Sequence, residues 1–176
     1  GFSSLPRKRI SWLLVLFVAQ AFTSNILRHY EGELSEVIAL ALFIPLLIGT
    51  GGNAGSQAST LVIRALAVGE ITVRDFARVV WRESRLGLAL GLTMAVATYI
   101  RAIAIGGSLE LGITVAATIV TIVAVSSTVG AGIPIIGRRL GIDPAVLSAP
   151  VITTIIDSAG LFIYFEFARN ILNLTK

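Results

Sequence analysis

Long runs of apolar residues constrain this chain more than any other feature of its sequence. They occupy residues 10–27, 37–66, 86–105, 111–136 and 151–172, and the second run is interrupted by a glycine-rich stretch at 49–55. A helix that crosses a bilayer needs about 20 mostly apolar residues, and it satisfies its backbone polar groups internally. The runs therefore predict an all-α integral membrane protein with five transmembrane helices.

The composition agrees with this prediction and narrows the possible functions. Of the 176 residues, 55% are hydrophobic and 14% are charged, whereas soluble proteins have about 25% charged residues. The sequence has no cysteine and one histidine, His29, which argues against thiolate, haem and His-based zinc sites. It also lacks the P-loop, HExxH and GxSxG motifs, so we expect no enzyme. Residues 1–176 are interpreted as a single transmembrane domain.

The basic residues predict the orientation in the membrane. With five spans, one side holds ten Lys and Arg residues: Arg7, Lys8, Arg9, Arg64, Arg74, Arg78, Arg82, Arg85, Arg138 and Arg139. The other side holds four: Arg28, Arg101, Arg169 and Lys176. The positive-inside rule then predicts a cytoplasmic N-terminus and an external C-terminus. This bias explains the net charge of +4, so no nucleic-acid partner is needed. Residues 73–85 are predicted to form a separate amphipathic helix at the membrane surface.

One acidic residue lies deep in an apolar run. Asp157 follows Val151 by six residues, and no Lys or Arg lies within a helical turn or two. On a helix, Thr153 and Gly160 share a face with Asp157. An ionisable residue in a span is by default a functional site, although a structural Asp that ties two helices together is the alternative. Glu166, further along, is expected to pair with Arg169.

The small residues inside the spans allow two interpretations. The stretch GTGGNAG at 49–55 predicts either a helix opened beside a water-filled pathway or tight helix packing. Asn53 and Gln57 are one turn apart and would both face such a pathway. Packing is the favoured interpretation for Gly87, for Gly91 and for the stretch 126–134, where Pro134 suggests a kink.

A single carboxylate per chain is a weak site for a divalent cation. A two-fold homodimer would bring two together on its axis, and such hard oxygen ligands suit Mg²⁺, Ca²⁺ or Mn²⁺. Two segments then point to a family. Residues 43–71 read FIPLLIGTGGNAGSQASTLVIRALAVGEI and residues 140–165 read LGIDPAVLSAPVITTIIDSAGLFIYF. Both strongly resemble MgtE-type magnesium channels, and the resemblance extends over nearly the whole chain.

The resemblance implies a homodimer with five helices per subunit and a pore at the two-fold axis, conducting Mg²⁺ across the inner or plasma membrane. Asp157 would be the central site for a largely hydrated ion, and the Thr153 carbonyl would be a further contact. The expected lining residues are Gly52, Asn53, Gln57, Gly160 and Ala149. Ala149 stands where some relatives carry Asn, and it lacks the amide that would make a side-chain contact there. Ca²⁺, Mn²⁺ or Co²⁺ would compete with Mg²⁺.

Full-length bacterial members of the family that this chain resembles also carry cytosolic Mg²⁺-sensing domains, which are absent from this sequence. They would be partners of the pore in an intact protein if the sequence is an excised fragment, and the alternative is a naturally short member of the family. Two other functions stay open at this stage. A secondary transporter would exchange Mg²⁺ for Na⁺ or H⁺, and a broken helix would suit it. A non-conducting scaffold would use Asp157 structurally.

Overall fold

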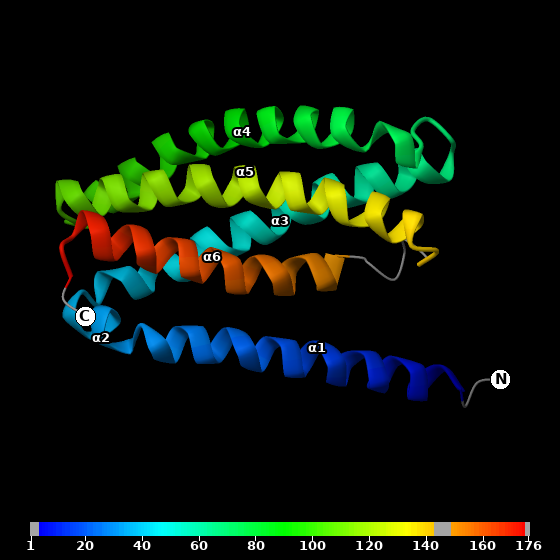
Figure 1. The fold of residues 1–176 in the computed structure, drawn as a ribbon. Helices are drawn as coiled ribbons and strands as arrows, with labels where there is room; N and C mark the ends of the chain where they lie inside the picture. Colours follow the sequence, from blue (N-terminus) through cyan, green and yellow to red (C-terminus); the bar gives the residue numbers. More distant parts are fainter. Residues whose placement is uncertain (1–3, 143–148, 175–176) are drawn as a thin grey trace.

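The computed structural model describes residues 4–142 and 149–174 (Figure 1). The described part contains helices only. They are α1 (Ser4–His29), α2 (Glu31–Glu36), α3 (Ala39–Ala67), the 3₁₀ turn η1 (Val73–Asp75), α4 (Phe76–Ala104), α5 (Leu109–Arg139) and α6 (Ala149–Ile171). Five helical segments are long and apolar enough to cross a membrane. The predicted all-α fold with five spans is therefore confirmed.

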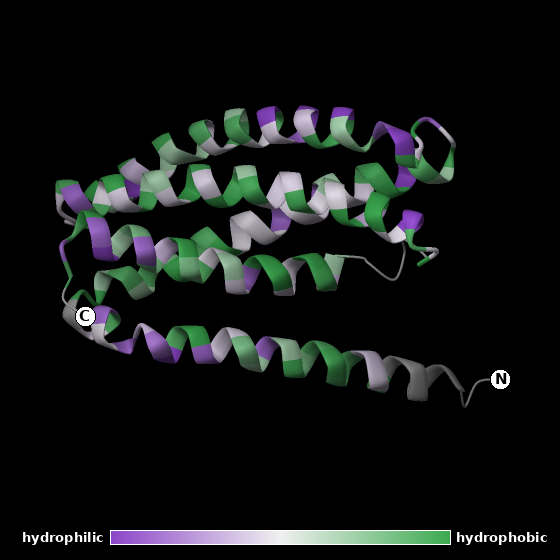
Figure 2. Ribbon diagram, in the orientation of Figure 1, coloured by the Kyte–Doolittle hydropathy of each residue, from purple (hydrophilic) through white to green (hydrophobic). Residues whose placement is uncertain are grey.

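Helix α5 lies at the centre of the bundle. It packs along α3, α4 and α6, and α3 also packs along α6. Helix α1 contacts the bundle mainly through α6 and lies at its edge (Figure 1). Large apolar side chains of α1, such as Phe17 at 72% exposed, point away from the other helices. Figure 2 shows hydrophobic residues along most of each long helix, which suits a chain surrounded by lipid.

Glycines bring the backbones of neighbouring helices together. A Cβ atom on Gly91 would lie 2.9 Å from the Cα atom of Val120, and one on Gly87 would lie 2.8 Å from the Cβ atom of Ser127. These contacts join α4 to α5, as the packing interpretation of Gly87 and Gly91 predicts. At the crossing of α3 and α5, a Cβ on Gly130 would overlap the carbonyl group of Gly55. Small residues at such crossings allow close packing without a hydrophobic driving force.

Of the two interpretations of the glycine-rich stretch 49–55, the structure has the packed helix, because α3 continues through it without a break from Ala39 to Ala67. Gly51, Gly52 and Gly55 of this stretch face α5 and α6. The expectation of a separate surface helix at residues 73–85 is wrong. After the short turn η1, α4 runs unbroken from Phe76 to Ala104, since no helix-breaking residue separates the amphipathic stretch from the span. Pro134 lies within α5, which is one continuous helix from Leu109 to Arg139. The kink at Pro134 stays a prediction.

Candidate functional site

Asp157 lies on the third turn of α6, within a membrane-spanning segment. Its side chain is half-buried. The Nε2 atom of Gln20 on α1 donates a hydrogen bond of 3.3 Å to its Oδ2 atom. Among the described residues, no Lys or Arg forms an ion pair with Asp157. The partner of the carboxylate is thus a neutral amide. The absence of a basic partner among the described residues agrees with the absence of Lys and Arg near Asp157 in the sequence.

Helix α1 reaches Asp157 through polar residues that the sequence analysis did not single out. Besides Gln20, Thr23 contributes a hydroxyl that lies 2.6 Å from the hydroxyl of Ser158. Both residues are polar members of an otherwise apolar run, and this was the available signal in the sequence. Because polar side chains in a span tend to find partners on other helices, these two contacts fix α1 along the Asp157 face of α6.

One turn before Asp157, α6 packs against the glycines of α3. A Cβ on Gly52 would lie 3.3 Å from the Cγ2 atom of Thr153. The Thr153 hydroxyl donates to the carbonyl oxygen of Pro150 at 3.1 Å, so it is used within its own helix. Gly52 and Thr153, which the resemblance names as contacts, therefore lie side by side. The observed role of the glycine is to admit α6 closely.

Asn53 and Gln57 lie on an exposed face of α3. With Ser56, Thr60 and Leu61 they line an open cavity of about 460 Å³. Two amides and two hydroxyls on one face of a membrane helix are costly beside hydrocarbon. The structure brings Asn53 and Gln57 together on one face, as their spacing predicts, and this face suits water or a second subunit better than lipid.

The last two expected lining residues lie in different surroundings. Gly160 is buried, and a Cβ there would lie 2.7 Å from the Cδ1 atom of Ile48. In a single chain this glycine therefore packs α6 on α3. Ala149 is the exposed first residue of α6. A lining role for either residue stays a prediction.

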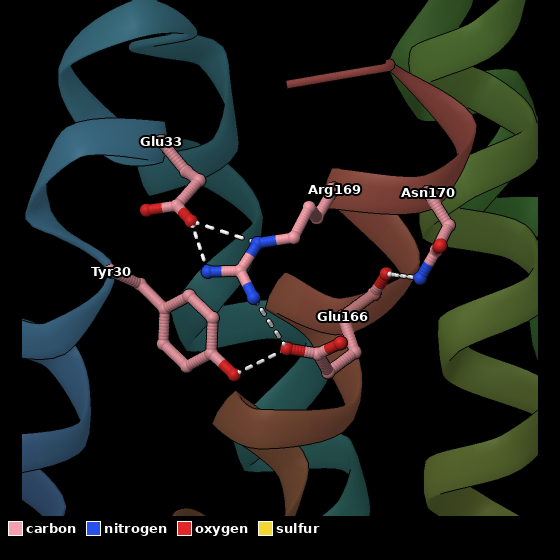
Figure 3. A network of polar contacts seen from close by, with 5 residues as sticks. All are labelled: Tyr30, Glu33, Glu166, Arg169 and Asn170. Carbon is pink, nitrogen blue, oxygen red and sulfur yellow. Dashed lines mark hydrogen bonds and ion pairs between the residues drawn. The ribbon is translucent and has the colours of Figure 1, made fainter. Parts of the chain in front are cut away.

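A polar network at the far end of α6 was only partly foreseen (Figure 3). The expected pair is present, with Nη1 of Arg169 lying 3.0 Å from Oε1 of Glu166. Arg169 also pairs with Glu33 of α2, and its Nε atom lies 3.0 Å from Oε1 of Glu33. Tyr30 donates a hydrogen bond of 2.7 Å to Glu166. Sequence spacing reveals the Glu166–Arg169 pair, which is local, but not the partners that lie more than 130 residues away.

The electrostatics of this network follow from its burial. Burial is the largest single influence on the Glu33 carboxyl and would raise its pKa. The hydrogen bond from Arg169, a backbone hydrogen bond and the charges of Arg169 and His29 together outweigh burial and hold that pKa below its ordinary value. Burial and the hydrogen bond to Glu166 raise the pKa of Tyr30 to about 12. Tyr30 therefore stays a donor at neutral pH, and the network ties α1 and α2 to α6.

Comparison with known proteins adds independent information. The profile of the MgtE family, described as a divalent cation transporter, matches residues 44–167. A magnesium transporter MgtE of Thermus thermophilus is 43% identical over 164 residues, which cover 93% of this chain and 36% of that protein. Proteins of the same name from Bacillus subtilis and Enterococcus faecalis are 35% and 34% identical over 161 residues each.

This chain thus spans 36% of the length of each of these relatives. The matched residues include Asp157 and most of α3 and α6. Since the family profile covers well over half of the chain, the chain belongs to the MgtE family of divalent cation transporters.

Proposed function

We propose that this chain forms the transmembrane pore of a homodimeric Mg²⁺ channel in the cell membrane, in which Asp157 binds a largely hydrated ion. The observation that carries the proposal is the position of Asp157. Its carboxylate is half-buried in a span, and its partner is the neutral amide of Gln20. A carboxylate that is not neutralised by a basic residue attracts a cation.

The dimer follows from the number of ligands. Among the residues described, no three His, Asp or Glu side chains gather into a metal site. One carboxylate is a weak site for a divalent ion, but a two-fold axis beside Asp157 would pair it with its copy. Mg²⁺ keeps several of its waters and is usually held by one or two carboxylates, so two Asp157 side chains suit a hydrated ion. Ca²⁺, Mn²⁺ and Co²⁺ are expected competitors.

A channel is favoured over an exchanger of Mg²⁺ with Na⁺ or H⁺ because α3 is continuous. A discontinuous helix at mid-membrane is typical of secondary transporter sites, and an opened helix at 49–55 would have suited one. Helix α3 instead runs unbroken through these glycines, which leaves side chains and not freed backbone groups to form the pathway.

The polar face of α3 provides a route for the hydrated ion. Asn53 and Gln57 line the open cavity, and their amides can hydrogen-bond the waters that Mg²⁺ retains. Thr153 and Gly52 meet one turn before Asp157 on α6. In the dimer we place the polar face of α3 and the Asp157 face of α6 along the axis.

We further propose a cytoplasmic N-terminus and an external C-terminus, because the larger set of basic residues lies on the N-terminal side. The relatives are much longer than this chain, and Mg²⁺-sensing cytosolic domains are the expected partners of the pore in an intact protein. In this orientation the network of Arg169 and Glu33 lies at the external end.

The test is Mg²⁺ flux through purified protein in liposomes, for the wild type, Asp157→Asn and Asp157→Ala. Even at the dielectric constant of water, a divalent ion about 4.5 Å from a carboxylate gains roughly 2 kcal/mol, which corresponds to more than tenfold in occupancy. Both variants should therefore lose most of the flux. Glu110→Gln is the matched control, since Glu110 is an exposed carboxylate on the first turn of α5.

The reversal potential separates the two transport mechanisms. A channel follows the Mg²⁺ gradient alone, whereas an exchanger shifts its reversal potential with Na⁺ or pH. Unchanged Mg²⁺ flux in both Asp157 variants would refute the proposed site and leave a structural role for this residue.

A further inference from the structure

A second cavity, unconnected with the ion pathway, lies between the start of α4 and the end of α5. Its volume is about 280 Å³, and it is lined by Val73, Phe76, Ile135, Ile136 and Arg139. Four of these five residues are apolar, and Arg139 is the only charged one. The cavity is therefore an apolar groove with a cation at one side.

The apolar residues of the groove differ in how deeply they are buried. Gly132 of α5 leaves room beside the Phe76 ring, since a Cβ there would lie 3.6 Å from its Cε2 atom. Ile135 forms a buried floor with 1% exposure, whereas Phe76 and Ile136 remain 38% and 46% exposed. The exposed apolar walls need a hydrocarbon cover.

The end of the bundle that holds the groove is strongly basic. Figure 2 shows hydrophilic residues on successive turns at the start of α4, next to the groove. The described arginines at this end are Arg64, Arg74, Arg78, Arg82, Arg85, Arg138 and Arg139, and the described carboxylates are Glu70, Asp75 and Glu83.

Most of these arginines form no ion pair with another described residue. Arg78 pairs with Asp75 and Arg82 pairs with Glu83. Within the described ranges 4–142 and 149–174, Arg139 and its neighbour Arg138 form no ion pair. Both side chains are exposed. The groove therefore has a surplus of positive charge at its rim, and its occupant should be anionic.

The groove lies at the ends of two segments that are long and apolar enough to span a membrane. It is formed where η1 and α4 begin and where α5 ends, so we place it at the membrane surface. Trp81, one turn and a half further along α4 from Phe76, is 66% exposed, as is usual for aromatic residues at the boundary of hydrocarbon and headgroups. Headgroup phosphates and the first acyl carbons are found at this depth.

We propose that this groove binds an anionic phospholipid, with its phosphate on Arg139 and the upper part of an acyl chain on Phe76 and Ile136. The site goes beyond the proposed ion pathway and does not depend on it. A lipid is favoured over a protein segment because the lining combines exposed apolar walls with an unpaired arginine at the membrane surface. Basic pockets between helices on the cytoplasmic side are known to suit such headgroups.

The experiment is native mass spectrometry of the purified chain, titrated with phosphatidylglycerol or phosphatidylcholine in detergent. We expect retention of phosphatidylglycerol in preference to phosphatidylcholine. One arginine near an anionic surface contributes on the order of 1 kcal/mol, which corresponds to about fivefold in affinity. Arg139→Gln should weaken phosphatidylglycerol binding by about that factor. Arg101→Gln, an exposed arginine in the last turn of α4, is the matched control and should leave binding unchanged.

A second variant tests the apolar half of the site. Ile136→Trp places a larger side chain in the groove and keeps every arginine, so it should also reduce retention of phosphatidylglycerol. Equal retention of the two lipids by the wild type would overturn the proposal. Equal losses in Arg139→Gln and Arg101→Gln would overturn it too, because they would show general charge attraction. Chemical modification of Arg139, measured with added lipid or with an added soluble protein domain, separates the two kinds of occupant. Protection of Arg139 by the soluble domain and not by lipid would show a protein-docking site and would make the proposal wrong.

Discussion

The crossing of α3 and α5 allows a sharp test of how this bundle is held together. A Cβ atom on Gly130 would overlap the carbonyl oxygen of Gly55 and would lie 2.8 Å from its carbonyl carbon and 2.9 Å from its Cα atom. All three neighbours are backbone atoms, so no side-chain rotation can relieve the overlap. In Gly130→Ala the two helices must move apart by several tenths of an ångström or more.

Helix α5 itself provides the control. Gly132 is also buried and lies two residues further along, but a Cβ there would meet its nearest atom, on the Phe76 ring, at 3.6 Å. This is ordinary van der Waals contact. Gly132→Ala therefore fits without movement, and it gains up to about 1 kcal/mol from the higher helix propensity of Ala. Both changes add one methyl group to the same helix.

The two substitutions should change the free energy of unfolding in opposite directions. Overpacking costs about 1–3 kcal/mol, and the rigid backbone neighbours place Gly130→Ala at the upper end. Since α3 carries Asn53 and Gln57 on its exposed face, its displacement should also lower Mg²⁺ flux. Gly132→Ala should unfold at the wild-type temperature or above it and should conduct normally.

Thermal unfolding in detergent, followed by circular dichroism, and flux in liposomes measure the two effects. We expect a clear fall in the midpoint temperature for Gly130→Ala alone. If Gly130→Ala and Gly132→Ala had the same midpoint as the wild type, the close contact of Gly130 with Gly55 would not stabilise the bundle, and the packing argument would be refuted.

Three further predictions concern the network at the end of α6. Arg169→Met leaves Glu33, whose side chain is 5% exposed, without its cation. The free energy of unfolding should fall by about 3 kcal/mol, the low end for a broken buried pair because the Arg169 side chain is 19% exposed. A midpoint temperature within a degree of the wild type would contradict this. Tyr30→Phe removes one hydrogen bond to Glu166 and should lower stability by about 1 kcal/mol in the same unfolding assay. Because the folded-state pKa of Glu33 is depressed, the stability that it contributes is present above the ordinary carboxyl range and is lost as the pH falls through the folded-state pKa. Glu33→Gln should therefore flatten the acid limb of a plot of midpoint against pH, and an unchanged slope would count against this role.

The helices themselves could be predicted from local sequence, because the length of an apolar run decides whether it spans a membrane. Residues 10–27 and 111–136 lie within observed helices, and residues 86–105 exceed α4 by one residue. Local sequence left two outcomes open where glycines are dense. The stretch 49–55 is compatible with an opened or a packed helix, and its glycines pack against Ile122, Ile152 and Thr153 of the neighbouring helices.

The candidate site was likewise foreseen in part. Asp157 stands out in the sequence because a carboxylate in a span needs a reason, and Asn53 and Gln57 share a face because they are one turn apart. Gln20 was missed, since an amide in a span gives no sign of which helix it will reach. Glu33 was missed for the same reason, because its partner Arg169 lies 136 residues away.

The sequence by itself determined the class of protein, the number of spans and the isolated carboxylate, because hydrophobicity and helical periodicity are local properties of the chain. The tertiary structure alone decided which helices meet and what each glycine does. Gly130 brings α5 onto the backbone of α3, while Gly132, of the same type and two positions away, has room for a methyl group beside the Phe76 ring. The difference lies in the atoms that face each Cα, and these come from segments far apart in the sequence.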